Sequence, residues 1–240
     1  MKLIEAYIAS KQTALRSHPF FLRLAQLPDI QSLLNIAPTM AFWVMAFQDI
    51  LRLNEPQVKD PYLLKVARHH RLEDAGHQQW FLQDIGTENE ARCGIRQLFS
   101  PKDTVIRDAA YAIVAEVFRA GDDQARITLP LVLESAGHVF FGHMSVLSVK
   151  SNTEGRLKYF SKSHMDVEAA HEIFETEMER KVYEAVLPPE KQFAIKGMVD
   201  RCYTAFNAMF DYLLVHLDLD IQARGVILAQ PDQQTRGYSP

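Results

Sequence analysis

Apolar residues recur about every 3.6 positions along most of the chain, a pattern that predicts amphipathic helices. Residues that are typical of helix starts and ends separate these stretches. Asp60-Pro61 is typical of an N-cap followed by proline at the first helical position, and Ser100-Pro101 repeats that signal. Gly86 is a stop signal after Ile85. The pattern predicts about seven helices, at residues 2–15, 28–54 with a break near Pro38, 61–85, 101–120, 127–149, 154–186 and 190–218.

The spacing of turn residues indicates an all-α fold. The 240 residues contain only ten glycines, and no Asn-Gly or Asp-Gly joins two alternating apolar runs as a β-hairpin would require. No internal repeat or linker divides the chain. We therefore expect one helical domain over residues 1–228, a bundle held together by helix packing, followed by a polar C-terminal tail at 229–240.

Composition narrows the function classes. The chain is 48% apolar and 23% charged, which is typical of a globular protein. Its net charge of −4 disfavours nucleic acid as a partner. The apolar run around residues 39–47 is too short for a membrane span, and no signal peptide is recognisable. The two cysteines, Cys93 and Cys202, indicate reduced thiols and a cytoplasmic location.

Acidic and histidine side chains interrupt the apolar stripe of the predicted 61–85 helix. Asp74 and His77 are three residues apart on that stripe, a spacing that lets two helical side chains reach one metal ion. We prefer Asp74 over the adjacent Glu73 because Glu73 lies nearer the edge of the stripe. The stripe consists of Leu63, Ala67, His70, Asp74, His77, Phe81 and Ile85.

Two later helices carry the same residue types. Glu134 follows the apolar run at 129–133, where an unpaired carboxylate would be costly, and His138 is one turn further on. The 154–186 helix has a stripe that starts at Leu157 and contains the strongest motif. That motif, His-x-x-x-Glu-x-x-His, is formed by His164, Glu168 and His171, with Glu175 on the same side and Asp166 on the other.

Together these residues predict a metal centre. Three inward carboxylates would repel one another, whereas two divalent ions would balance their charge. Oxygen and imidazole donors without thiolate suit iron or manganese, and zinc also remains compatible. The competing interpretation is a hydrogen-bonded core network or an exposed i, i+4 network without metal. The expected ligands are Asp74, His77, Glu134, His164, Glu168 and His171, and the residues expected around them are His70, Glu73, His138 and Glu175.

The order of these residues resembles the heme-oxygenase-like superfamily, with its TenA and PqqC proteins, and most of all its non-heme diiron oxidases and oxygenases. In that group an acid and a histidine lie on one core helix, a lone glutamate on a later one, and His-x-x-x-(Asp/Glu)-x-x-His on the next. His77, Glu134 and the 164–171 motif match this order. The first acid matches Asp74 in some members, whereas in others its position is that of His70. The resemblance implies two iron ions, although a site holding one is compatible.

The leading hypothesis is therefore an iron-dependent oxidase or oxygenase that uses O₂ and a small organic substrate. Glu134 and Glu168 are its candidate catalytic carboxylates. The alternatives are a metal-free TenA- or PqqC-like hydrolase, oxidase or binding protein, and a pure interaction protein. A homodimer is left open by the sequence. The residues expected to line an apolar substrate cavity are Phe42, Trp43, Phe47, Phe81 and Phe141.

Overall fold

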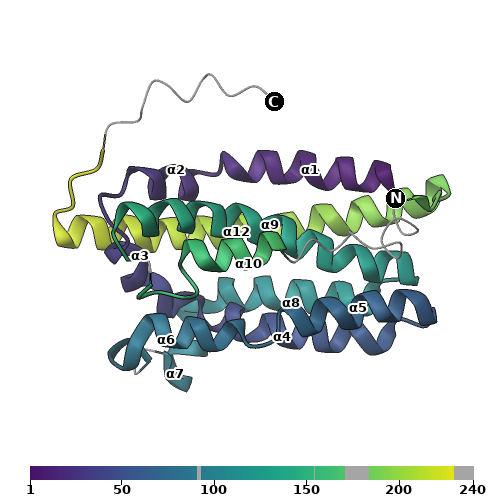
Figure 1. Cartoon of the computed structure of the whole chain (residues 1–240), viewed down its shortest axis with the longest axis horizontal. Helices are drawn as coiled ribbons and strands as arrows, with labels where there is room; N and C mark the ends of the chain where they lie inside the picture. Colours follow the sequence, from purple (N-terminus) through teal and green to yellow (C-terminus); the bar gives the residue numbers. More distant parts are fainter. Residues whose placement is uncertain (91–92, 154, 171–183, 230–240) are drawn as a thin grey trace.

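The computed structural model describes residues 1–90, 93–153, 155–170 and 184–229, and every regular element in these ranges is a helix (Figure 1). The prediction of an all-α fold is confirmed. Helices labelled η are 3-10 helices. The elements are α1 (Lys2–Arg16), α2 (Pro19–Gln26), α3 (Gln31–Ile36), η1 (Ala37–Met40), α4 (Ala41–Asn54), η2 (Glu55–Gln57), α5 (Pro61–Glu73), α6 (His77–Glu90), α7 (Ile95–Leu98), η4 (Pro101–Asp103), α8 (Thr104–Arg119), α9 (Asp123–Lys150), α10 (Lys162–Ala170) and α12 (Pro189–Arg224).

The long helices run side by side along the longest dimension of the molecule (Figure 1). Helix α8 packs against α4 and α12, while α9 packs against α1, α5, α10 and α12. Local signals fix several helix starts: the Asp60 carboxylate accepts hydrogen bonds from the backbone N–H groups of Tyr62 and Leu63, as its N-cap position predicts. The predicted break near Pro38 is confirmed as η1, between α3 and α4.

The predicted 61–85 helix is wrong as one continuous helix. It ends at Glu73, and the chain turns through Asp74 and Gly76 before α6 begins at His77. Gly76 has a φ of +101°, a conformation that side chains with a Cβ rarely adopt, so glycine permits this turn. The stop signal at Gly86 is confirmed, because its φ of +67° interrupts the helical geometry of α6.

The predicted 154–186 helix is also wrong at its start. Residues 155–161 form turns, and α10 begins only at Lys162, so Leu157 does not belong to a helical stripe. The Asp84 carboxylate holds these turns against α6 by accepting hydrogen bonds from the backbone N–H groups of Lys158 (2.7 Å) and Phe160 (2.9 Å). Residues 171–183, with the second half of the predicted helix, lie outside the described residues.

Helix α9 contains a proline, Pro130, and a side chain from another helix replaces the backbone hydrogen bond that this proline cannot make. Pro130 has no N–H group to donate to the carbonyl of Arg126, four residues earlier. The buried Asn54 side chain fills this gap, because its Nδ2 donates to the Arg126 carbonyl oxygen at 2.9 Å. The chain thus keeps α9 helical through the proline and ties its first third to the end of α4.

Two further predictions concern the apolar segment and the tail. The stretch Gln31–Gln57 is apolar enough to cross a membrane by length and composition, but it comprises α3, η1, α4 and η2, and part of it is buried in the core. The core helices of soluble proteins share these properties. At the end of the chain, the Ala229 N–H donates to the Gln26 carbonyl oxygen at 2.9 Å. The rest of the predicted tail lies outside the described residues.

A buried ion pair joins α8 to α12. The Glu116 side chain is 3% exposed and receives two hydrogen bonds from Arg201, each at 2.8 Å, as well as one from Arg119. Removing one partner of such a pair strongly lowers the free energy of unfolding, because the remaining buried charge then lacks compensation.

We predict that Arg201→Met lowers the free energy of unfolding by about 1–3 kcal/mol, because Glu116 loses its bidentate partner while staying buried. The matched control is Arg52→Met, which breaks a pair with Asp49 in which both side chains are more than 60% exposed and should change that energy by less than about 0.5 kcal/mol. Urea denaturation measures both. Equal effects of the two variants would contradict the role of the buried pair.

Candidate metal centre

Three predicted site residues converge in the middle of the bundle. His70 lies in the last turn of α5, Asp74 directly follows that helix, and Glu134 faces them from α9. The Nδ1–H group of His70 donates to Glu134 Oε1 at 2.7 Å, and His70 Nε2 lies 3.2 Å from Asp74 Oδ2. Each of the three residues offers one potential ligand atom, and these three atoms lie within 4.8 Å of one another. The arrangement can therefore hold a cation.

Two further histidines extend this cluster. His77 Nδ1 lies 3.6 Å from Asp74 Oδ1, and the His77 ring is 4.7 Å from the ring of His164 at the start of α10. His164 is 1% exposed, and its Nδ1–H donates to the Tyr159 carbonyl oxygen at 2.8 Å. Metal-binding histidines commonly make this hydrogen bond, which fixes the proton on one ring nitrogen and presents the other to the ion.

Charge dominates the chemistry of His70. Complete burial by itself lowers the pKa of an imidazole, but the charge and hydrogen bond of Glu134, with smaller effects of Asp74 and Glu73, raise the pKa of His70 to about 9. At neutral pH the ring is therefore protonated in the metal-free protein. Its positive charge balances two carboxylates that would otherwise repel each other.

An aromatic cavity of about 80 Å³ opens beside this cluster, several times the ~10–15 Å³ that one buried water needs. Glu134, His77 and His164 form part of its polar wall, and most other lining residues are apolar. The predictions for Trp43, Phe47 and Phe141 are confirmed. Phe42 and Phe81 are not among the lining residues: Phe42 packs against Phe99 and Tyr111, and Phe81 against Tyr159 and Phe160.

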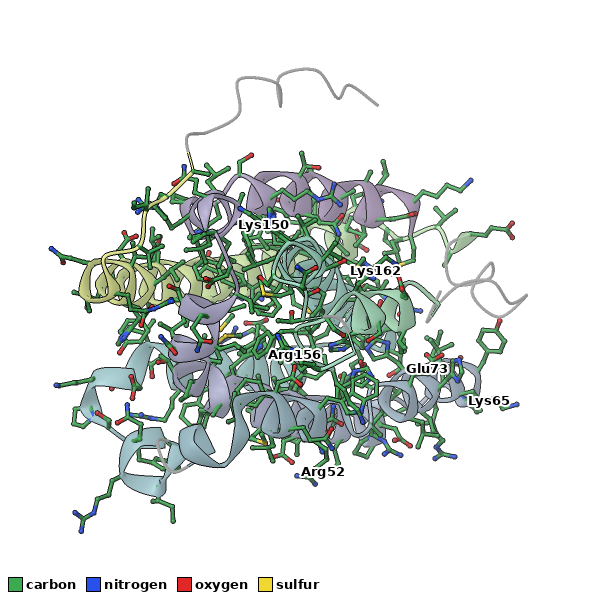
Figure 2. All side chains as sticks on the ribbon, turned by 60° about the vertical axis from the view of Figure 1, so that its left-hand side comes forward. Arg52, Lys65, Glu73, Lys150, Arg156 and Lys162 are labelled. Carbon is green, nitrogen blue, oxygen red and sulfur yellow. The ribbon has the colours of Figure 1, made fainter. Side chains whose placement is uncertain are left out.

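The described lining of the cavity contains no lysine or arginine. The basic side chains labelled in Figure 2, Arg52, Lys65, Lys150, Arg156 and Lys162, are all exposed and lie outside it. Amide groups are present instead. Gln48 Nε2 donates to the Asp74 carbonyl oxygen at 2.7 Å, and Gln78 Oε1 is buried without a hydrogen-bond partner among the described residues.

The preference for Asp74 over Glu73 agrees with this geometry. Glu73 pairs with the exposed His69 at 3.1 Å, whereas Asp74 is 5% exposed and belongs to the cluster. The sequence placed His70 at the margin of the site, but it lies at the centre. Its signal was its i, i+4 spacing to Asp74 on the apolar stripe. His138 is not among the residues that line the cavity.

The remaining predicted ligands cannot be placed in the same way. Glu168 lies on α10, but its side chain is outside the described part of the structure, as are His171 and Glu175. The described residues thus form one group of three potential ligands, with two histidines beside it. The other half of the expected dinuclear site stays a prediction.

One observation of this structure indicates that the group of His70, Asp74 and Glu134 suits a metal ion. His70 Nε2 is buried and makes no hydrogen bond with the described residues, although Asp74 Oδ2 lies only 3.2 Å away, because the two groups are poorly aligned. A buried nitrogen atom without a hydrogen bond is costly unless another group binds it. Imidazole nitrogens and carboxylate oxygens are donors that suit iron and manganese.

No protein-family model and no curated protein matches this chain significantly. The assignment of function therefore depends on the geometry of the site itself.

We predict that His70 of the metal-free protein titrates with a pKa of about 9, as NMR of its ring can measure. This pKa exceeds the value of ~6.5 for an unfolded histidine, so its contribution to stability is fully present below pH ~6.5 and is lost as the pH rises through 9. Glu134→Gln removes the main compensating charge and should lower that pKa and flatten the fall in unfolding free energy.

Glu73→Gln is the matched control, because Glu73 is an adjacent carboxylate that pairs with His69 outside the cluster. It should lower the pKa of His70 by less than Glu134→Gln does, because Glu73 is the smallest of the charges that raise it. A pKa near 6.5 in the wild-type protein, or equal shifts in the two variants, would contradict the proposed charge balance around His70.

Proposed function

We propose that this protein is a non-heme iron-dependent oxidase or oxygenase that uses O₂ to act on a small organic substrate in the aromatic cavity. The observation that carries the proposal is the grouping of His70, Asp74 and Glu134, with His77 and His164 beside them. All of these residues except His70 line that cavity. It agrees with the resemblance to diiron members of the heme-oxygenase-like superfamily. Iron, when bound, would supply the electron transfer to O₂ that protein side chains do not provide.

The residues of the chain have separate tasks in this proposal. Asp74 and Glu134 provide the negative charge that holds the cation, and His70, His77 and His164 provide nitrogen donors. The Tyr159 carbonyl orients His164, and Gln48 holds the backbone of Asp74. The aromatic walls exclude water, which strengthens the electrostatic interactions inside the cavity.

The number of ions follows from which ligands take part. His70, Asp74 and Glu134 provide three donors for one ion. A second ion would draw on Glu168 and His171 of the closing motif, as the resemblance implies. Manganese would suit the same donors. We further propose a cytoplasmic enzyme, since both cysteines are free thiols.

One observation favours a second function without metal. His70, protonated and hydrogen-bonded to Glu134, forms an acid–base pair beside a cavity, as a hydrolase or a cofactor-free oxidase could use. A thiol nucleophile has no support among the described residues. Cys202 is buried, which raises its pKa to about 12, and neither cysteine lines the cavity.

We predict saturable binding of Fe(II) under anaerobic conditions, with one or two ions per chain by metal analysis. Binding should strengthen as the pH rises towards 9, because the ion must displace the proton of His70. Glu134→Ala should weaken binding by at least about 100-fold, since even residues that only support a ligand contribute about 10–100-fold. Absence of saturable binding would favour the metal-free function.

A pair of variants on α10 tests the closing motif. Glu168→Ala should weaken the binding of iron while the protein stays folded. Asp166→Ala is the control, because Asp166 is exposed and pairs with Lys162 on the same helix. Equal loss of iron in both variants, or in neither, would contradict the assignment of the motif.

A further inference from the structure

The outer side of α8 carries two large, exposed aromatic residues. Tyr111 is 52% and Phe118 is 58% exposed, and the two lie seven residues apart on one side of the helix. At 100° per residue, six exposed side chains share a sector of about 120°. We call this surface the α8 face; it consists of Asp108, Tyr111, Ala112, Ala115, Phe118 and Arg119.

A row of aromatic rings continues the α8 face onto neighbouring elements. The Phe42 ring lies 5.5 Å from the Tyr111 ring and 5.8 Å from the ring of Phe99, which is itself 56% exposed. Single exposed apolar side chains are ordinary, but a contiguous group of large ones commonly marks an interaction surface.

We propose that the α8 face is the contact surface of a homodimer, in which the α8 helices of two copies pack antiparallel about a twofold axis. This inference is independent of the proposed function. The axis would pass between Ile113 and Val114, so that residues equally distant from this point face each other across the interface. A twofold interface requires one surface to be complementary to itself, and the α8 face meets that condition in charge and in shape.

The charges of the α8 face are complementary only in the antiparallel arrangement. Asp108 and Arg119 lie equally far from the axis, so each faces the other residue of the second copy. A parallel pair would instead bring Asp108 against Asp108 and Arg119 against Arg119. Among the described residues Asp108 makes no ion pair, and Arg119, which also bonds Glu116, has further donors on its guanidinium group.

The shape of the face agrees with the same arrangement. Ala112 of one copy faces Ala115 of the other at the centre, where small side chains let the two helices approach closely. Tyr111 and Phe118 lie on one edge, and a twofold axis across the helices keeps the aromatic edges of both copies on the same side. Tyr111 then lies about two residues, or ~3 Å along the axis, from Phe118 of the second copy. The four rings form one row.

A second copy fits this surface better than other partners. The one acid and one base of the face give it no net charge, whereas anionic lipid or nucleic acid would require a basic surface. The self-complementary order of charged, small and aromatic residues favours the same helix as the partner.

Sedimentation of the full chain tests the proposal at micromolar concentrations. We expect a dimer for the wild-type protein and monomers for Phe118→Glu and Asp108→Arg, with at least about tenfold weaker association. Phe193→Glu is the control, because Phe193 is an 84% exposed aromatic residue that belongs to α12 and not to the α8 face. This variant should stay dimeric. Circular dichroism verifies that each variant is folded.

Mixing two charge variants tests the antiparallel arrangement itself. Asp108→Arg and Arg119→Asp should each be monomeric alone but associate with each other, because both ion pairs across the interface then join opposite charges. The double variant D108R/R119D should likewise form a homodimer. A wild-type monomer at 100 µM (about 2.7 mg/ml from the chain mass of 27.4 kDa) would overturn the proposal, as would charge variants that dissociate but do not restore association when mixed.

Discussion

The buried carboxylate of Asp74 and the partly buried carboxylate of Glu134 share one buried imidazole, that of His70, and this site depends on balancing their charge. An ionised carboxylate in a protein interior is destabilised by several kcal/mol unless a cation or hydrogen bonds compensate it. In the metal-free protein, the proton of His70 provides this compensation. A divalent cation would provide more positive charge among the same three side chains. Proton binding, metal binding and stability are therefore linked at this site.

The turn after α5 makes this convergence possible. On one straight helix, His70 and His77 would be separated by about 10 Å along the axis. The left-handed conformation of Gly76 instead redirects the chain, so that α6 starts with His77 beside the ring of His164. The hydrogen bond from Gln48 to the Asp74 carbonyl and those of Asp84 to the turns before α10 hold the two sides of the site.

Sequence patterns predicted those features that depend on neighbouring residues. The helical class, the capping Asp60 and the interruptions at Pro38 and Gly86 all follow from local backbone preferences. Burial of Asp74, His77 and His164 followed from charged or polar side chains on apolar stripes. These signals need no knowledge of distant contacts.

The predictions that were wrong concern features that depend on contacts between residues far apart in the sequence. A single glycine is tolerated in a helix, so Gly76 gave no decisive sign of a turn, and Leu157 matched a helical spacing although it precedes α10. The central role of His70 depends on Glu134, a residue of another helix. Local patterns can show that a polar residue faces inward, but they do not identify its tertiary partner.

Under the proposed function, the cavity would constrain how a substrate is oriented. Its described wall offers no lysine or arginine, so no ion pair with these residues can fix an anionic substrate there. Among the described residues, only the shape of the wall and its few polar groups are available to orient a substrate. Among these, Gln78 Oε1 is buried and accepts no hydrogen bond from the described residues, and so has capacity for a donor. Under the proposed function, the described aromatic walls and the buried amide acceptor would favour an uncharged, largely apolar molecule that carries a hydroxyl or amide N–H. Such a group would satisfy Gln78 without placing a further charge beside the carboxylates.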